Sequence, residues 1–198
     1  MKILPKTKAI DFSVYDIDHN LISLKSYQGK RILLSFYRYA SCPLCNLRVH
    51  ELIETKKQFE AYGIELIAVF QSSIEQIKMY VGSQDVPFPI IADPEQKLYK
   101  LYGVKTSIIK TLLSIFKLNR MKEAHRKGYK IGKSDGPITR VPADFLINEH
   151  FVVELSYYGK DISDHLPIKE IFDQFEKTER KRNHYEEISC IMENRSHD

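Results

Sequence analysis

The segment Cys42-Pro43-Leu44-Cys45 constrains the fold of this chain more than any other, because of what flanks it. A short, mostly apolar run at 31–37 precedes it and is typical of a buried strand. About 18 residues without Gly or Pro follow it, with apolar side chains at helical spacing. A C-x-x-C between a strand and a helix is typical of a redox-active dithiol.

The expected helix start gives the two cysteines different environments. Proline favours the first helical position, so Pro43 predicts Cys42 as the N-cap. A thiolate at Cys42 could accept a hydrogen bond from the Cys45 N–H and would face the positive end of the helix dipole. Both effects lower a thiol pKa from about 8.5 toward the range of roughly 3.5–7.5. Cys45 shares an apolar stripe with Val49 and Leu52, which predicts that it is the more buried thiol.

Two other interpretations of the C-x-x-C are inert core cysteines and half of a zinc site. Zinc takes four ligands, and the chain has no second C-x-x-C. His50 is expected on the polar face of the helix with Asn46 and Glu54, and the third cysteine, Cys190, lies with His184 in a polar tail. Redox chemistry is therefore the favoured interpretation.

A lowered thiol pKa by itself adds little rate, because the gain in thiolate is offset by a loss of nucleophilicity. Fast peroxide reduction therefore needs hydrogen-bond donors aimed at the peroxide oxygens. Arg38, four residues before Cys42, and Arg140, just before Val141-Pro142, are the candidate donors. The alternative for each arginine is a surface position or a structural ion pair.

Strands and helices alternate along the rest of the chain. Strands are predicted at 10–15, 21–24, 64–70, 87–91, 145–148 and 151–156, and helices at 73–81, 93–102 and after Pro167. For the helix at 93–102, Asp93 is the predicted N-cap and Gln96 closes a capping box. This order implies a three-layer α/β domain over 1–176, with 177–198 as a polar C-terminal tail or helix extension.

The positive charge of the chain is concentrated in one segment. Residues 105–133 hold nine basic side chains and one acid, a formal charge of +8, whereas the whole chain carries +4. An apolar helix at 108–116 is expected, followed by a basic stretch at 119–133. We expect this helix to pack on the domain or on a second copy of it. The alternatives are a platform for an acidic partner, nucleic acid or anionic lipid.

Composition narrows the class of protein. Three cysteines are too few for a disulfide scaffold, and the N-terminus lacks the apolar stretch of a signal peptide. No apolar run approaches the roughly 18 residues of a membrane span. A cytoplasmic protein with reduced thiols is the expectation.

Four blocks in order resemble the peroxiredoxin-like branch of the thioredoxin superfamily, the alkyl hydroperoxide reductase/thiol-specific antioxidant (AhpC/TSA, redoxin) family. They are KAIDFSVYDIDHNLISLKSYQGK, ILLSFYRYASCPLCNLRVHEL, FPIIADPEQKLYKLYGV and TRVPADFLINEHFVVELSYYGK. The resemblance implies a thioredoxin fold, in which a central mixed sheet is flanked by helices. An N-terminal hairpin and a helical basic insert at about 105–135 would be added to it.

The active-site segment departs from the main pattern of that family, P-x-x-x-[ST]-x-x-C. Aligning Cys45 with the peroxidatic cysteine places Arg38 on the proline and Cys42 on the Thr or Ser. The C-P-x-C is thioredoxin-like instead, and similarity to thioredoxins makes Pro142 a cis-proline facing the dithiol. Pro43, Val141 and Pro142 are accordingly expected to position the substrate.

The two lines of argument differ on the nucleophile. Capping geometry and similarity to thioredoxins favour Cys42, which we expect for disulfide exchange. The peroxiredoxin alignment favours Cys45, which we expect for peroxide attack. In either case the partner cysteine would resolve the first product to a Cys42–Cys45 disulfide.

The resemblance implies a thiol-dependent antioxidant oxidoreductase that reduces peroxides through a Cys42/Cys45 dithiol–disulfide cycle without a bound cofactor or metal. An external thiol reductant, thioredoxin- or glutaredoxin-like, would restore the dithiol. One alternative is a thiol–disulfide oxidoreductase that acts on protein disulfides with little peroxidase activity. Another is a redox-switched binding module that uses the basic insert. A homodimer is left open, and nucleic acid is not an expected partner.

Overall fold

A computed structural model describes residues 1–113 and 118–177 of the chain. Its internal contacts divide it into two compact units, 1–165 and 166–198. The described part of the second unit contains one helix, at 168–177. The division at 176/177 stays a prediction, and Cys190 and His184 lie outside the described residues.

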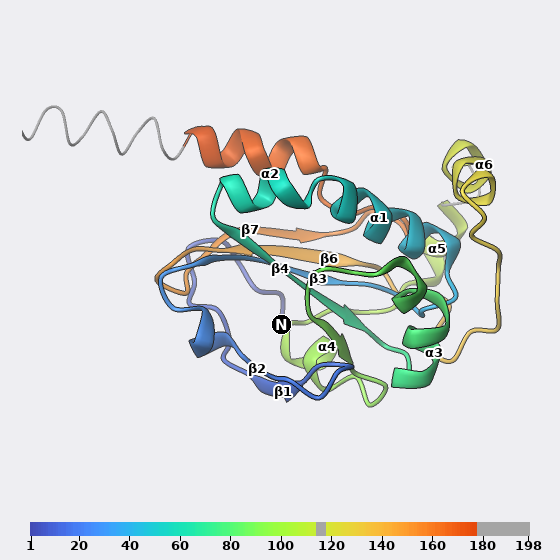
Figure 1. Ribbon diagram of the computed structural model, residues 1–198, viewed down its shortest axis with the longest axis horizontal. Helices are drawn as coiled ribbons and strands as arrows, with labels where there is room; N and C mark the ends of the chain where they lie inside the picture. Colours follow the sequence, from blue (N-terminus) through green and yellow to red (C-terminus); the bar gives the residue numbers. More distant parts are fainter. Residues whose placement is uncertain (114–117, 178–198) are drawn as a thin grey trace, which may run out of the picture. The chain divides into compact units, whose positions relative to one another are not determined.

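The first unit is built on a five-stranded mixed sheet with the strand order β5-β4-β3-β6-β7 (Figure 1). Strands β3, β4 and β5 run parallel to one another, whereas β6 is antiparallel to both β3 and β7. The strand bounds are β3 Arg31–Phe36, β4 Ile64–Phe70, β5 Ile90–Ala92, β6 Ala143–Ile147 and β7 Val153–Tyr158. The predicted N-terminal hairpin is confirmed as β1 (Ser13–Tyr15) paired with β2 (Leu21–Ser23). The thioredoxin-fold prediction is confirmed in its mixed sheet and in the hairpin.

The helices of this unit cover both faces of the sheet, as Figure 1 shows. Their bounds are α1 Pro43–Glu54, α2 Lys56–Ala61, α3 Ile74–Tyr80, α4 Lys97–Leu101, α5 Ile108–Leu113 and α6 Leu118–Arg126, with 3-10 turns at Leu24–Tyr27 and Gly82–Gln84. In β3, Ile32, Leu34 and Phe36 join the core that includes the hairpin and α4. The alternate residues, such as Ser35, lie on the face that α1 covers.

The predicted long helix after the cysteines is two helices in the structure. The break lies at Thr55, whose backbone leaves the helical region at φ −100° and ψ 4°. The Thr55 hydroxyl donates to the carbonyl oxygen of Glu51 at 2.7 Å. A threonine side chain that bonds its own preceding turn weakens a helix at that point, which explains the interruption. The expectation of one continuous helix is therefore wrong.

The capping box at Asp93 is also wrong, although Asp93 does cap. The helix α4 begins at Lys97, and the Asp93 carboxylate accepts from the N–H groups of Lys97, Leu98 and Tyr99 at 2.9, 2.7 and 3.2 Å. Gln96 has a left-handed backbone (φ 59°) and makes no capping bond with its side chain. The turn at 94–96 folds the chain back, so the Asp93 carboxylate reaches the N–H groups at the start of α4 that have no partner within the helix.

The basic insert splits into a packed helix and an exposed one. In α6, Ala124 is fully buried, and Arg120 contacts Glu51 of α1 at 2.6 Å. In α5, by contrast, Ile108, Ile109 and Leu112 are 71%, 74% and 58% exposed. The packing expectation concerned the apolar helix at 108–116, and for the described residues of α5 it is wrong as a contact with their own domain. The packing of α6 on α1 was not predicted. No helix among the described residues is long and apolar enough to cross a bilayer.

We expect Gly103→Ala to destabilise the fold more than Gly128→Ala. Both glycines have positive φ, +65° and +87°, so an added side chain costs about 1 kcal/mol of strain at either position. At Gly103 the new Cβ would also overlap the carbonyl oxygen of Met1, whereas nothing lies within 4 Å at Gly128. Denaturant titration should give losses of about 2–4 and about 1 kcal/mol, respectively. Equal losses would contradict the close approach of the N-terminal segment.

Candidate active site

The dithiol lies at the N-terminus of α1, just beyond the end of β3. Cys42 is the N-cap with an extended backbone, and Pro43 is the first helical residue, as predicted. Both cysteines are free thiols, with exposures of only 1% for Cys42 and 2% for Cys45. The prediction that Cys45 is the more buried is therefore wrong, because both side chains are almost completely buried.

The surroundings of Cys42 favour its thiolate form. The Cys45 thiol donates a hydrogen bond to it, and Arg38 Nη1 donates to its Sγ at 3.2 Å. Burial acts in the opposite direction, but these donors prevail and lower the pKa of Cys42 to about 6. The Cys45 N–H does not form the predicted capping hydrogen bond to the Cys42 sulfur, but the N–H groups of Cys45 and Leu44 still lower the pKa of Cys42 by smaller amounts.

Cys45 is held in the opposite state. Burial raises its pKa well above the ordinary thiol value, and its hydrogen bond to Cys42 and the negative charge there raise the pKa further. The charge of Arg38 opposes this rise without overcoming it. Near neutral pH the pair therefore holds one proton, on Cys45, and one negative charge, on Cys42.

Arg38 connects the dithiol to a distant part of the chain. Its Nη1 donates to Cys42, and its Nη2 donates to the carbonyl oxygen of Ile138. The side chain is 4% exposed, and its guanidinium lies 4.9 Å from the ring centre of Tyr39. The Nε atom is buried without a hydrogen-bond partner in the described part of the chain. One donor beside the sulfur is thus still available to a ligand.

Asn46 is a structural residue of this site that the sequence pattern did not identify. It was expected on a polar helix face, but it is 3% exposed. Its amide donates to the carbonyl oxygens of Ala40 and Cys42 at 2.7 and 3.0 Å, and it accepts from Gln84 at 3.0 Å. These bonds hold the loop that carries Cys42. The only signal in the sequence is that Asn46 lies one helical turn after Cys42.

No described hydrogen bond joins Arg140 to the dithiol. Its Nε donates to Gln71 at 3.0 Å and its Nη1 to the carbonyl oxygen of Val104 at 2.9 Å, while Nη2 donates to the Gln96 side chain. The guanidinium also stacks 4.7 Å from the ring centre of Tyr99. None of its described hydrogen bonds reaches a sulfur, so the structural contacts of Arg140 are with the segment around α4.

The Val141–Pro142 peptide bond is trans, so the cis-proline prediction is wrong. The Val141 N–H donates to the carbonyl oxygen of Lys105 at 3.2 Å, and the Pro142 carbonyl oxygen accepts from Gly159 at 2.9 Å. These bonds carry the chain directly into β6, which begins at Ala143. A residue before proline favours such an extended backbone.

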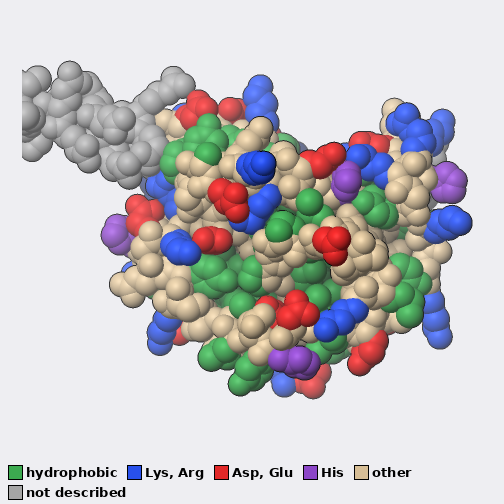
Figure 2. Space-filling view, in the orientation of Figure 1, with side chains coloured by type: hydrophobic (Ala, Val, Ile, Leu, Met, Phe, Trp, Pro, Cys, Tyr) green, Lys and Arg blue, Asp and Glu red, His purple; other side chains and the backbone are tan. Residues whose placement is uncertain are grey.

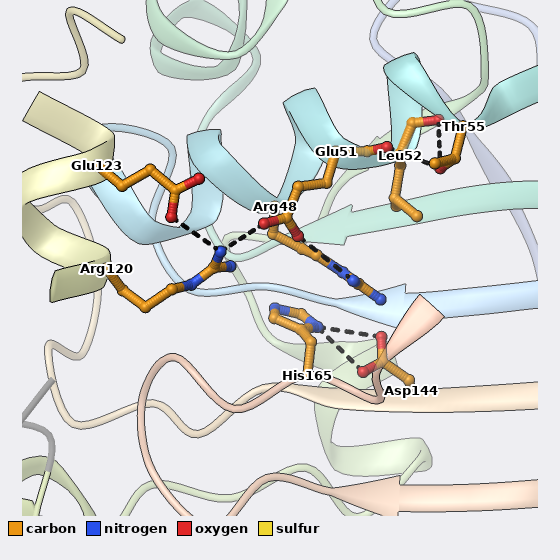
Figure 3. A network of polar contacts seen from close by, with 8 residues as sticks. All are labelled: Arg48, Glu51, Leu52, Thr55, Arg120, Glu123, Asp144 and His165. Carbon is orange, nitrogen blue, oxygen red and sulfur yellow. Dashed lines mark hydrogen bonds and ion pairs between the residues drawn. The ribbon is translucent and has the colours of Figure 1, made fainter. Parts of the chain in front are cut away.

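A buried polar network lies on the α1 side of the sheet (Figure 3). Asp144 of β6 is fully buried, and both its oxygens lie 3.1 Å from Nδ1 of His165. Burial alone would raise the pKa of Asp144, but His165, Arg48 and Ser35 lower it below its usual value. Arg48 continues the network to Glu51, which in turn binds Arg120 of α6 at 2.6 Å.

A cavity of about 730 Å³ opens beside Pro43, between α1 and the basic insert. Its lining comes almost entirely from the insert: Asn119, Met121, Lys122, His125, Arg126, Tyr129 and Ile131. Lys, Arg and His side chains gather at the edge of the molecule that carries α6 (Figure 2). Within the described ranges, no three His, Cys, Asp or Glu side chains form a group that could hold a metal ion.

Comparisons with known proteins agree with this geometry. The AhpC/TSA family model matches residues 5–155. Peroxiredoxin Bcp of Escherichia coli is 24% identical over 149 residues, which cover 74% of this chain and 89% of that protein. Peroxiredoxin 2 of Thermoplasma acidophilum is 33% identical over 104 residues, covering 49% of this chain and 51% of that one.

A solved structure extends the likeness to the fold. The crystal structure of a peroxiredoxin 6 variant of Arenicola marina superposes with a TM-score of 0.68 at 16% identity, covering 89% of this chain and 74% of that chain. A family match over residues 5–155 includes the dithiol and most of the first unit. The chain therefore belongs to the AhpC/TSA family, as a peroxiredoxin-like oxidoreductase with a thioredoxin-like C-P-x-C.

Proposed function

We propose that this oxidoreductase is a thiol peroxidase in which Cys42 attacks the peroxide and Cys45 resolves the product. The observation that carries the assignment is the asymmetry of the dithiol: the pKa of Cys42 is lowered to about 6, while that of Cys45 is raised. A thiolate is the attacking species in both steps. Oxidation of Cys42 to the sulfenic acid removes the negative charge that helps to raise the pKa of Cys45, so Cys45 can then ionise and resolve the product. This asymmetry favours Cys42 over the Cys45 nucleophile that the peroxiredoxin alignment suggests.

The cycle balances without a cofactor. The Cys42 thiolate attacks one oxygen of ROOH, the O–O bond breaks, and the products are a Cys42 sulfenic acid and ROH after one proton is taken up. Cys45 then loses its proton and attacks the Cys42 sulfur as a thiolate; the S–O bond breaks, the Cys42–Cys45 disulfide forms, and the hydroxide takes up a proton and leaves as water. An external dithiol returns two electrons and two protons. We propose a thioredoxin- or glutaredoxin-like reductant for that step.

Arg38 supplies the donors that the O–O cleavage needs. Its Nη1 lies 3.2 Å from the Cys42 sulfur, and its buried Nε has no described partner. A fixed donor at this position can stabilise the negative charge that develops on the leaving oxygen. Arg140, predicted as a second donor, is assigned a supporting role, since its contacts hold Gln71 and Gln96. Pro43 lines the cavity beside α6 and remains a candidate substrate-positioning residue. The same role for Val141 and Pro142 stays a prediction.

Disulfide exchange is the second candidate function. The C-P-x-C arrangement and the low pKa of Cys42 suit a thiolate that attacks a disulfide sulfur as well as one that attacks a peroxide. Either reaction needs a reduced thiol pool, and we place it in the cytoplasm on that ground. Whether two copies of the chain assemble for it stays a prediction.

The rate of peroxide consumption should follow the titration of Cys42. We expect the rate to be half-maximal near pH 6, to change little from pH 7 to 8, and to fall about tenfold for each pH unit below 5. The sign follows from the reactive form, which is the thiolate and is lost as pH falls. Stopped-flow measurement of hydrogen peroxide loss, beside a protein-disulfide reduction assay, checks both candidates.

The outcomes of these two assays are distinct. Peroxide loss no faster than that with free cysteine, together with active disulfide reduction, would leave disulfide exchange as the function. A half-maximal rate near pH 8.5 or higher would show that the attacking thiol is not the lowered one.

A further inference from the structure

Residues 132–138 form a strap that crosses the loops following β3 and β4. Ser41 is the residue before Cys42, and its hydroxyl donates to the carbonyl oxygen of Lys133 at 2.8 Å. The Gln71 side chain donates to the carbonyl oxygen of Pro137 at 3.0 Å, and Arg38 donates to that of Ile138. The strap is therefore bonded to both loops that surround the dithiol.

Asp135 is the strongest attachment of the strap. Its carboxylate accepts from the Ser72 hydroxyl at 2.6 Å and from the Ser73 N–H at 3.1 Å. The Ser72 hydroxyl also accepts from the N–H of Ala40 at 2.8 Å, in the loop before Cys42. Hydrogen bonds to a charged acceptor are the stronger ones in proteins. Asp135 thus ties the strap to the loop after β4 and, through Ser72, to the loop that carries the dithiol.

Two glycines allow the strap to lie directly on these loops. A Cβ at Gly132 would lie 2.5 Å from the Tyr80 hydroxyl oxygen and 2.7 Å from the Cβ of Ser41. A Cβ at Gly136 would lie 2.6 Å from the Gln71 side-chain nitrogen. The backbone at both glycines therefore lies too close to these side chains to accommodate a Cβ, and Ser41 is the residue before Cys42, whose side chain is 1% exposed.

We propose that the strap is a size filter, so that the closed protein acts on hydrogen peroxide and other small hydroperoxides, while bulky hydroperoxides and protein disulfides react only when it opens. The proposal rests on the peroxidase function, since it names the substrate class of that dithiol. A disulfide in a folded protein must bring its sulfur into line with Cys42, and the closed strap prevents that approach. Hydrogen peroxide has only two heavy atoms, so it needs a far smaller displacement of the strap to reach the Cys42 sulfur.

The test removes the attachment of the strap through Asp135 and leaves the dithiol intact. In Asp135→Ala, we expect the rate with cumene hydroperoxide to rise about tenfold, the factor that corresponds to about 1.4 kcal/mol lost from the closed state. The rate with hydrogen peroxide should change less than twofold. Asp18→Ala, which removes an exposed carboxylate that pairs with Lys78, is the charge-matched control and should change neither rate. A rise for both peroxides, or for neither, would overturn the size filter.

A second measurement does not depend on peroxidase activity. Iodoacetamide and a fluorescein-linked iodoacetamide carry the same reactive group but differ in bulk. We expect the bulky reagent to alkylate Cys42 about tenfold faster in Asp135→Ala than in the wild type, with less than a twofold change for the small one. Asp135→Asn keeps an acceptor for the Ser72 hydroxyl, so its rate of alkylation by the bulky reagent should lie between those of the wild type and Asp135→Ala. This variant replaces Asp135→Ala in the test if the alanine variant does not fold.

The two measurements separate the two proposals. Size-dependent alkylation in a protein that consumes no peroxide would retain the strap and reject the peroxidase function. If the protein consumes peroxide but Asp135→Ala changes the alkylation rate of neither reagent, the peroxidase function is retained and the size filter is rejected.

Discussion

Cys42→Ser should abolish peroxide reduction, with a loss of about a thousandfold or more in the rate of peroxide consumption. A serine hydroxyl is not ionised near neutral pH, so the variant has no nucleophile at the position that Arg38 activates at 3.2 Å. The raised pKa of Cys45 prevents that cysteine from replacing it. Stopped-flow consumption of hydrogen peroxide by the purified variant measures the loss.

Cys45→Ser is the informative partner of that variant. It should consume one equivalent of peroxide and stop at the Cys42 sulfenic acid, because no second thiol remains among the described residues to form the disulfide. Its first turnover should be only a few times slower, since a serine hydroxyl can still donate to the thiolate. Mass spectrometry of the trapped product identifies the oxidised residue.

Cys190→Ser is the matched control for both variants and should leave peroxide consumption unchanged. The opposite pattern, a fast first turnover in Cys42→Ser and none in Cys45→Ser, would assign peroxide attack to Cys45. The alignment with the main peroxiredoxin pattern would then be correct, and the asymmetry of the two pKa values would not control the chemistry.

The largest expected loss of stability is at Asp144, whose replacement by alanine should lower the free energy of unfolding by about 3–5 kcal/mol. The side chain is fully buried and pairs with His165 at 3.1 Å, with Arg48 contributing to the same network (Figure 3). Removing the carboxylate leaves those buried partners without their acceptor. Urea denaturation followed by circular dichroism measures the change.

The control for Asp144 lies at the exposed end of the same network. Glu123 pairs with Arg120 at 3.3 Å, and both side chains are 38% exposed. Because exposed ion pairs contribute about 0–1 kcal/mol, Glu123→Ala should cost far less than Asp144→Ala. Similar losses in the two variants would show that the buried pair adds no more stability than a surface contact.

The pH dependence of the Asp144 effect has a defined sign. The pKa of Asp144 is lowered from 3.8 in the folded protein, so the ionised carboxylate stabilises the fold. That contribution is complete above the unfolded pKa and is lost as pH falls through the folded one. The difference in stability between wild type and Asp144→Asn should thus shrink as pH falls below about 4, where the wild-type carboxylate takes up a proton.

The features that the sequence predicted correctly depend on neighbours a few residues apart. The runs at 31–37 and 64–70 are strands, Pro43 begins α1, and Cys42 is its N-cap. Each follows from apolar periodicity or from the preference of proline for a first helical turn. The errors at Thr55 and Gln96 are also local, and arise because a side chain competes with the backbone pattern that was expected.

The features that sequence could not decide all need residues far apart in the chain to meet. Arg38 was a candidate because it lies four residues from Cys42, but its second contact, Ile138, is a hundred residues away. Arg140 was paired with the dithiol by its place before Val141-Pro142, yet tertiary structure directs its hydrogen bonds to Gln71 and Gln96. Sequence spacing carries no information on which of two distant loops a long side chain reaches.

The sequence by itself determined the mixed α/β sheet, the position of the dithiol at a helix start, and the membership of a thiol-dependent family. The helix start already favoured Cys42 as the thiolate, but only the tertiary structure showed the donors Arg38 and Cys45, which lower its pKa against the burial of both sulfurs. Burial and charge act over distances in space, whereas helix starts and strand periodicity act over distances along the chain. The strap and the Asp144–His165 pair depend on residues that are close in space but distant along the chain, which explains why the sequence predicted neither.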